Sequence, residues 1–168
     1  MDIGLAGTEE MYAAVTEFEV CAGVEVTASH NPIDYNGMKI VGRGSKPLSD
    51  NEFERIKNLA EENNFSQPQQ TGSVLDKKEV ARAAYFEKVL GFVDISILKP
   101  FKVVINSGNG AAGPTVDAIN KKLKEKGIKT NFVFVHHNPD STFPNGIPNP
   151  LLTENRSSTT SAVIKEQA

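Results

Sequence analysis

The stretch Gly23–Pro32 reads Gly-Val-Glu-Val-Thr-Ala-Ser-His-Asn-Pro, and it decides how the rest of the chain is interpreted. The β-branched residues near its start predict a short strand, and Pro32 excludes helix where the stretch ends. The small polar residues between them predict a loop at the end of a strand, where α/β enzymes place their reactive groups. This loop would hold Ser29 and His30 outward.

A second strand is predicted directly after the loop. Asn36 and Gly37 favour a tight turn, and Met38–Val41 has the pattern of a strand that returns past the first. This return could bring the ammonium group of Lys39 within reach of the Ser29 hydroxyl. A serine needs a base, a metal or a prior modification to act as a nucleophile, and an isolated Ser-His pair is more often part of a capped turn. The pair alone therefore leaves both interpretations open.

The wider string is more specific. Val26–Pro32, followed by Asp-Tyr-Asn-Gly-Met-Lys at Asp34–Lys39, resembles the active-site loop of the α-D-phosphohexomutases, the family of phosphomannomutases and phosphoglucomutases. The resemblance implies an isomerase that interconverts hexose 6-phosphate and hexose 1-phosphate of mannose, and possibly glucose. It implies that Ser29 is the phosphoserine that carries the phosphoryl group and also touches Mg²⁺. Lys39 would stabilise charge or transfer a proton, which fits phosphoryl transfer as mainly electrostatic positioning.

The same resemblance assigns roles to the other loop residues. His30 is expected among the catalytic residues, and Thr27, Asn31 and Asn36 are expected to bind the phosphate or the sugar. Hexose phosphates and hexose bisphosphates are the expected partners, and Mg²⁺ is the expected cofactor. Mg²⁺ takes about six oxygen ligands, usually including carboxylates, so Ser29 alone cannot hold it.

Three family features are not found in this sequence: the Asp-Gly-Asp-x-Asp-Arg metal loop, the Gly-Glu sugar-recognition loop and the Arg/Ser-rich phosphate loop. We therefore expect a truncated family member with little or no mutase activity alone. Apolar surfaces exposed by truncation would favour self-association. The alternative is a non-catalytic α/β module that binds a phosphorylated ligand.

The apolar pattern and the resemblance together predict an α/β fold in two units, residues 1–98 and 99–168. These would be two partial three-layer α/β/α units with mixed or parallel sheets, from the end of the first family domain and the start of the second. In the first unit, Met1–Leu5 has the pattern of a buried strand end, and Thr8 can begin a helix. Ser49 and Glu52 form a capping box for another helix, whose predicted buried side comprises Phe53, Ile56, Leu59 and Ala60. A third helix is predicted from Asp76 to about Val93.

The second unit has the pattern of a β-α-β motif. A strand at Phe101–Asn106, a helix at Pro114–Lys126 and a strand at Phe132–Val135 should place the two strands parallel. Proline at the start of that helix and Gly127 after it are typical helix punctuation. A polar final helix is predicted at Glu154–Gln167.

A glycine loop between the first strand and helix of this motif supports a rival interpretation. Gly108, Gly110 and Gly113 satisfy the G-x-G-x-x-G pattern of dinucleotide binding at Gly108–Gly113. That pattern also needs an acidic residue at the end of the next strand, which here ends in His136 and His137. The glycines could instead permit a tight turn and close packing, and the loop also resembles the opening of the family's second domain. The two histidines are interpreted as a strand end that meets solvent rather than as metal ligands.

Composition sets the remaining limits. Of 168 residues, 39% are hydrophobic and 23% charged, which is typical of a globular protein, and the net charge of −3 gives no basic face for nucleic acid. The single Cys21 excludes an intrachain disulfide and favours a reducing, cytoplasmic location. No apolar run reaches the roughly 20 residues of a membrane helix.

Overall fold

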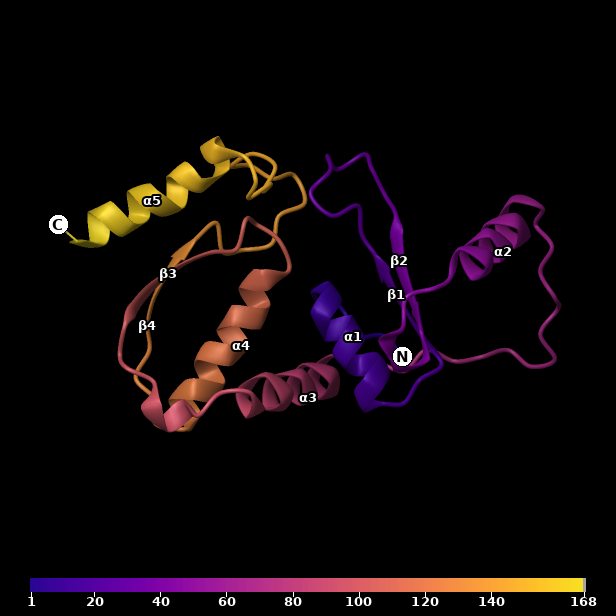
Figure 1. The fold of residues 1–168 in the computed structure, drawn as a ribbon, viewed down its shortest axis with the longest axis horizontal. Coiled ribbons are helices and arrows are strands. Elements are labelled where there is room, and N and C mark those ends of the chain that lie inside the picture. The colour runs from indigo at the N-terminus through magenta and orange to yellow at the C-terminus, as the bar shows by residue number, and fades with distance from the viewer. Residues whose placement is uncertain (168) are drawn as a thin grey trace. The chain divides into compact units, whose positions relative to one another are not determined.

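The computed structural model describes residues 1–167, and Ala168, the last residue of the second predicted unit, lies outside them. The chain forms two compact units. The first comprises Met1–Gly4, Thr8–Glu25 and Met38–Tyr85, and the second comprises Leu5–Gly7, Val26–Gly37 and the residues from Phe86 onward. The predicted boundary between residues 98 and 99 stays a prediction. The α/β class is confirmed, because helices combine with two two-stranded sheets (Figure 1).

The first unit contains helix α1 (Thr8–Glu17), strand β1 (Ala22–Val26) except its last residue, and strand β2 (Met38–Gly42). After β1 the chain turns back and returns as β2 beside it, as predicted (Figure 1). A short 3₁₀ turn, η1 (Arg43–Ser45), follows β2.

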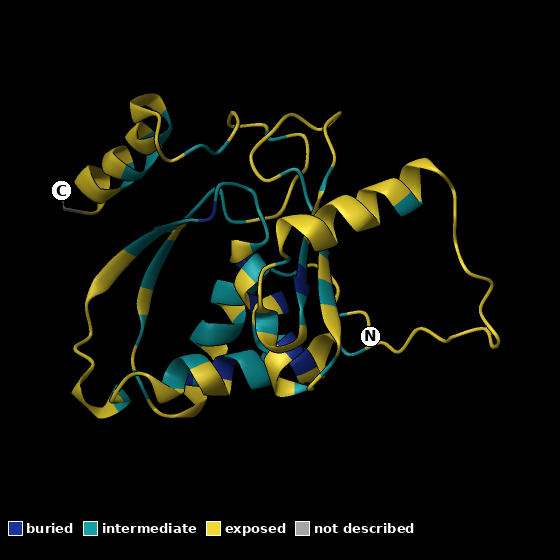
Figure 2. Ribbon diagram, turned by 45° about the vertical axis from the view of Figure 1, so that its right-hand side comes forward, coloured by how far each residue is buried: buried dark blue, intermediate teal, exposed yellow. Residues whose placement is uncertain are grey.

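The core of this unit lies between α1 and the strand pair. Met11 and Val15 of α1 cluster with Val41 of β2, and all three are buried. Figure 2 shows the buried stretches of the chain in dark blue. A Cβ at Gly23 of β1 would lie 2.5 Å from both Met11 Sδ and Val15 Cγ2. Because such a contact is too short for real atoms, α1 can approach β1 this closely only where the strand has a glycine.

Helix α2 (Asp50–Glu61) has the predicted capping box. Ser49 Oγ accepts from the Glu52 N–H at 3.4 Å, and Glu52 Oε2 accepts from the Ser49 N–H at 2.8 Å. The predicted buried side of α2 is wrong, because no residue of this helix is buried (Figure 2). Phe53 is 53% exposed. An amphipathic pattern is buried only by a partner surface, and none of the described helices or strands packs extensively against α2.

Helix α3 (Lys78–Gly91) confirms the third predicted helix but is shorter at both ends. The predicted buried strand end at Met1–Leu5 is wrong. Asp2 makes only an isolated parallel bridge to Asp76, and Leu5 is 57% exposed. A strand needs a continuous hydrogen-bonding partner, and here the pairing is limited to this single bridge.

The second unit contains the predicted β-α-β motif, preceded by a short 3₁₀ turn, η2 (Ile95–Ile97). Its elements are β3 (Lys102–Asn106), α4 (Ala112–Glu125) and β4 (Asn131–Val135), and β3 and β4 pair in parallel throughout. Helix α4 begins two residues before the predicted Pro114. Proline is tolerated there because the first helical turn does not use its N–H groups in the helix.

Helix α5 (Thr153–Gln167) completes the second unit. It packs along β3 and β4, while α4 lies on the other side of this strand pair (Figure 1). The second unit thus has the predicted helix–sheet–helix layering, built on a two-stranded parallel sheet.

Candidate active site

The loop between β1 and β2 leaves the first strand at Thr27 and is closed at its base by a backbone hydrogen bond. The Thr27 N–H donates to the Gly37 carbonyl at 2.9 Å. Ser29 lies two residues beyond Thr27 with a φ of 59°, in the left-handed region that non-glycine residues rarely occupy. Its N–H donates to Thr27 Oγ1 at 2.9 Å. This hydrogen bond holds the backbone of Ser29 in an uncommon conformation, which is typical of functional loops.

The Ser29 side chain is exposed and lies beside a histidine. Its Oγ is 3.2 Å from Nδ1 of His30, which is also exposed. In one tautomer Nδ1 accepts a hydrogen bond from the serine hydroxyl. The hydroxyl is therefore open to a ligand and has a base at hydrogen-bonding distance, and it is not enclosed in apolar packing.

Three predicted ligand-binding residues shape this loop through local hydrogen bonds. Thr27 receives the Ser29 N–H, Asn31 Nδ2 donates to the Ala28 carbonyl at 2.7 Å, and Asn36 Oδ1 accepts from its neighbouring Gly37 N–H at 2.9 Å. Their binding of phosphate or sugar stays a prediction. Their side chains already act as the internal supports of the loop.

Lys39 is exposed and lies in β2. Its ammonium donates to Thr8 Oγ1, at the first residue of α1, over 3.3 Å. Sequence reasoning did not identify this partner, because the two residues lie 31 positions apart. That the ammonium comes within reach of Ser29 stays a prediction.

Glu25 of β1 is a further charged residue that the sequence analysis did not identify. Burial raises the pKa of its carboxyl, the positive charge of Lys39 lowers it, and the negative charges of Glu9 and Glu10 raise it again. The alternation along the strand could have indicated this residue, since Glu25 lies two positions after Gly23 and therefore shares the face that α1 covers.

A metal site was also predicted at Ser29. Among residues 1–167, no group of three or more His, Cys, Asp or Glu side chains is placed to hold a metal ion. The described residues do not fit a Mg²⁺ site by themselves, because Mg²⁺ demands near-octahedral oxygen coordination. Mg²⁺ at Ser29 stays a prediction that requires ligands besides this hydroxyl.

The glycine loop of the second unit is explained by close packing. A Cβ at Gly108, where φ is 57°, would lie 2.6 Å from Pro148 Cβ. A Cβ at Gly113 would overlap the carbonyl oxygen of His137. These two glycines are therefore required by the protein's own backbone and side chains, which supports the packing interpretation over the dinucleotide pattern.

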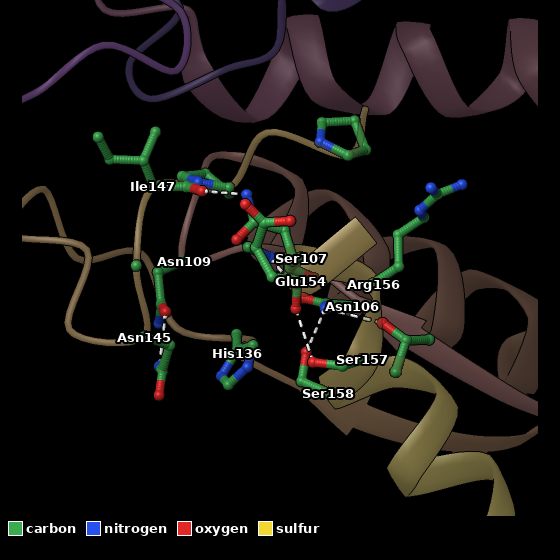
Figure 3. Close-up of a pocket in the computed structure, with 16 residues that line it drawn as sticks. Asn106, Ser107, Asn109, His136, Asn145, Ile147, Glu154, Arg156, Ser157 and Ser158 are labelled. Carbon is green, nitrogen blue, oxygen red and sulfur yellow. Dashed lines mark hydrogen bonds between the residues drawn. The ribbon is translucent and has the colours of Figure 1, made fainter. Parts of the chain in front are cut away.

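A pocket of about 570 Å³ opens beside this loop, at the end of β3 and near the start of α5 (Figure 3). Asn106 at its base donates through Nδ2 to Thr159 Oγ1 at 2.8 Å and to Ser158 Oγ at 3.2 Å. Asn145 Nδ2 donates to Asn109 Oδ1 at 2.9 Å on another side. These polar side chains bond to one another, so the pocket is lined by an internal network.

His137 contradicts the expectation that this strand end simply meets solvent. Its ring is half-buried and stacks on Phe134 with a centroid distance of 4.2 Å. Nε2 lies 2.9 Å from Asp117 Oδ1 of α4, and Nδ1 lies 3.5 Å from the buried Ser107 hydroxyl. The ring thus connects β4, α4 and the glycine loop. Its polar partners Asp117 and Ser107 lie 20 and 30 positions before His137 in the sequence.

Two sequence models of known domains match most of the chain. They are the phosphoglucomutase/phosphomannomutase α/β/α domain I over residues 1–67 and the α/β/α domain II over residues 83–168. The chain belongs to the phosphoglucomutase/phosphomannomutase family. The family resemblance of the Ser29 loop is thereby confirmed.

Individual phosphoglucomutase/phosphomannomutase relatives agree with this assignment. A phosphomannomutase from Escherichia coli is 48% identical over 169 residues, and phosphohexose mutases from Xanthomonas campestris are 44% identical. A crystal structure of a phosphoglucomutase/phosphomannomutase family protein from Burkholderia thailandensis superposes with a TM-score of 0.80 at 27% identity, covering 99% of this chain and 36% of that one.

The matches to the sequence relatives cover all of this chain but only 37% of the Escherichia coli protein and 36% of the Xanthomonas campestris protein. The chain thus spans little more than a third of the length of the family members it resembles. Separately, no helix within residues 1–167 combines the length and the apolar character needed to cross a bilayer.

Proposed function

We propose that this chain carries the phosphoserine loop of a mutase that interconverts hexose 6-phosphate and hexose 1-phosphate, with Ser29 as the phosphoryl carrier. The observation that carries the proposal is the exposed Ser29 hydroxyl, held on a left-handed backbone next to His30 in a loop of family sequence. The names of the relatives add support, since they are phosphomannomutases and phosphohexose mutases.

The proposed reaction moves a phosphoryl group twice. First, the bond between Ser29 Oγ and phosphorus breaks, and phosphorus bonds to a hydroxyl oxygen of the hexose phosphate, whose proton is released. The resulting hexose bisphosphate then returns its other phosphoryl group: the sugar oxygen–phosphorus bond breaks and the Ser29 Oγ–phosphorus bond re-forms. In the first transfer Ser29 Oγ takes up a proton as its phosphoryl group leaves. In the second transfer Ser29 Oγ gives up that proton, for which His30 Nδ1 at 3.2 Å is the proposed acceptor, and the sugar oxygen released from phosphorus takes up a proton to become a hydroxyl.

The remaining roles follow the family resemblance. Lys39 would stabilise the charge of the transferring group or move a proton, as expected when catalysis is mainly electrostatic. Thr27, Asn31 and Asn36 would bind the phosphate or the sugar. Mg²⁺ would neutralise phosphate charge when bound, with Ser29 as one ligand and the others supplied by groups outside the described residues.

Hexose phosphates and hexose bisphosphates are the proposed substrates, and the cytoplasm is the proposed location. Because the 168 residues span 37% of the length of the Escherichia coli relative, our proposal for this chain by itself is limited to the exchange of phosphate at Ser29. We expect little turnover of hexose 6-phosphate to hexose 1-phosphate from these residues alone.

Intact-mass spectrometry tests the proposal directly. The chain is incubated with glucose or mannose 1,6-bisphosphate and Mg²⁺, and we expect a species that carries one phosphate. Peptide mapping should place that phosphate on Ser29, and Ser29→Ala should abolish it. Ser107→Ala is the matched control, because Ser107 also follows a strand but is buried at 8% exposure.

Two results would contradict the proposal. The first is a wild-type chain that no bisphosphate can charge although its circular dichroism spectrum is that of a folded protein. The second is a phosphate that persists in Ser29→Ala. Saturable binding of a hexose phosphate without phosphate exchange would instead favour the non-catalytic module.

A further inference from the structure

Lys39 has a specific hydrogen-bond partner within the first unit. Its Nζ lies 3.3 Å from Thr8 Oγ1, where α1 begins. Side chains alternate between the two faces of a strand. Val41, two positions after Lys39, is buried against Met11 and Val15 of α1. Lys39 therefore lies on the α1 face of β2, and its ammonium reaches the start of that helix.

Glu25 lies on the same face of the neighbouring strand. Gly23, two positions earlier in β1, faces Met11 and Val15 of α1, so the alternation places Glu25 on the α1 side. The carboxyl of Glu25 interacts electrostatically with Lys39, Glu9 and Glu10. Lys39 is the one positive charge that acts on the Glu25 carboxyl, whereas Glu10 pairs with Arg82. The ammonium of Lys39 thus has a hydroxyl partner on the helix and a carboxyl on the same face of the adjacent strand.

The charged form of Glu25 is disfavoured at this position. Burial and the two glutamates of α1 raise the pKa of its carboxyl, and only Lys39 acts in the opposite direction. A neutral side chain at position 25 would avoid that repulsion. Residues that are costly for folding are often retained for function.

We propose that Thr8 and Glu25 are positioning residues that together fix the ammonium of Lys39 at the start of α1. This inference rests on the proposed function, because the position of the ammonium matters for the reaction only if Lys39 stabilises phosphoryl transfer. A lysine side chain has several rotatable bonds, so an unheld ammonium would spend much of its time elsewhere. A displacement of about 1 Å can cost on the order of a hundredfold in rate.

The first test is independent of activity. Carbon-13 NMR titration of the Glu25 carboxyl is compared in the wild type, Lys39→Met, Thr8→Val and Thr8→Ser. We expect Lys39→Met to raise the pKa of Glu25, because the attraction to the ammonium is lost. Thr8→Val should shift it in the same direction, whereas Thr8→Ser, which keeps the hydroxyl, should not. An unchanged Glu25 titration in Lys39→Met or Thr8→Val would overturn the inference.

The second test measures the rate at which a hexose 1,6-bisphosphate charges Ser29, by intact mass over a range of pH. We expect Thr8→Val and Glu25→Gln to slow charging roughly ten- to a hundredfold, and Thr8→Ser to restore it. Thr16→Val is the matched control, because the Thr16 hydroxyl bonds only to carbonyls within α1, and it should charge at the wild-type rate.

The two tests separate the inference from the proposed function. If the wild type is never charged but Glu25 responds to Lys39→Met and Thr8→Val, the contact is supported and the proposed function fails. If the wild type is charged and Thr8→Val and Glu25→Gln match its rate at every pH, the function stands and the positioning role is wrong.

Discussion

Glu10 of α1 and Arg82 of α3 form an ion pair with Arg82 Nε 3.3 Å from Glu10 Oε2. The side chain of Glu10 is 6% exposed and that of Arg82 is 22% exposed. The two helices are therefore joined by a charged contact that water reaches poorly. A buried ion pair contributes little net stability when intact, but the loss of one partner leaves an uncompensated charge.

We expect Arg82→Ala to lower the free energy of unfolding by about 2–3 kcal/mol, slightly below the range typical of fully buried pairs because Arg82 is partly exposed. Chemical denaturation measures this loss. Lys57→Ala is the control, since its pair with Glu54 is exposed on α2 and should cost less than about 0.5 kcal/mol. A double variant, Glu10→Gln with Arg82→Ala, should recover part of the lost free energy of unfolding. Equal losses for Arg82→Ala and Lys57→Ala would contradict the interpretation of the Glu10–Arg82 contact as a buried ion pair.

If Gly113 is required for close packing, its replacement by alanine should destabilise the protein, whereas the same replacement at an unpacked helix glycine should not. Gly113→Ala places a methyl group against the His137 carbonyl, so we expect a loss of at least about 1–3 kcal/mol from overpacking. Gly91→Ala is the matched control at the end of α3, where the new methyl would meet no atom of another described part of the chain within 4 Å. There the better helix propensity of alanine should leave stability unchanged or raise it by up to about 1 kcal/mol. Thermal unfolding of both variants measures these changes in stability. A Gly113→Ala variant as stable as the wild type would contradict the packing explanation and favour the dinucleotide interpretation.

The capping box of α2 predicts a pH dependence. Hydrogen bonds from Ser49 lower the pKa of Glu52 in the folded helix. A carboxyl with a lowered folded pKa contributes stability above its unfolded pKa, and this contribution is lost as the pH falls through the folded value. We therefore expect the amide protection factors of α2, which correct the exchange rates for their intrinsic pH dependence, to fall selectively on acidification below the ordinary glutamate pKa of 4.5.

Ser49→Ala should weaken the same helix at neutral pH, by about 1 kcal/mol as is typical for a lost N-cap. Because α2 buries no residue, the cap is a large part of what holds it. Amide exchange in α4, whose N-cap has no side-chain hydrogen bond, serves as the internal reference. Parallel changes in both helices would show global unfolding instead.

Self-association stays a prediction, and the first unit suggests where to test it. Val24 of β1 is 53% exposed and Met38 of β2 is 66% exposed, although both are apolar. We expect analytical ultracentrifugation to detect concentration-dependent association, and Val24→Thr with Met38→Thr to weaken it. Val74→Thr is the control, because Val74 is 82% exposed in a segment without helix or strand. A strictly monomeric wild type over the accessible concentrations would refute the prediction.

The sequence predicted local structure better than contacts. Its capping and turn residues located α2 and the β3–α4–β4 motif within a few positions, because those signals act over three or four residues. It failed where a distant partner decides the outcome. Phe53 has an amphipathic pattern around it but no surface to bury it, and His137 is joined to Asp117 and Ser107 by contacts that one sequence does not reveal.

In the candidate site, too, local features could be predicted from the sequence and distant contacts could not. The string around Ser29 was recognisable because its small residues, histidine and proline occur together in an uncommon order. Thr8 and Glu25 were not identified, since each is a common residue whose importance depends on the position of Lys39. The strand alternation could have indicated that Glu25 shares a face with Gly23, but it could not indicate the charge of Lys39 beside it.

The backbone conformation of Ser29 also bears on which hydroxyl amino acid could replace it as the proposed phosphate acceptor. Threonine offers an equivalent alcohol, yet its branched β-carbon is disfavoured at a φ of 59°. Tyrosine would move its hydroxyl several bonds farther from the main chain. Between the two aliphatic hydroxyl residues, the backbone conformation thus favours serine at position 29, independently of the reaction itself.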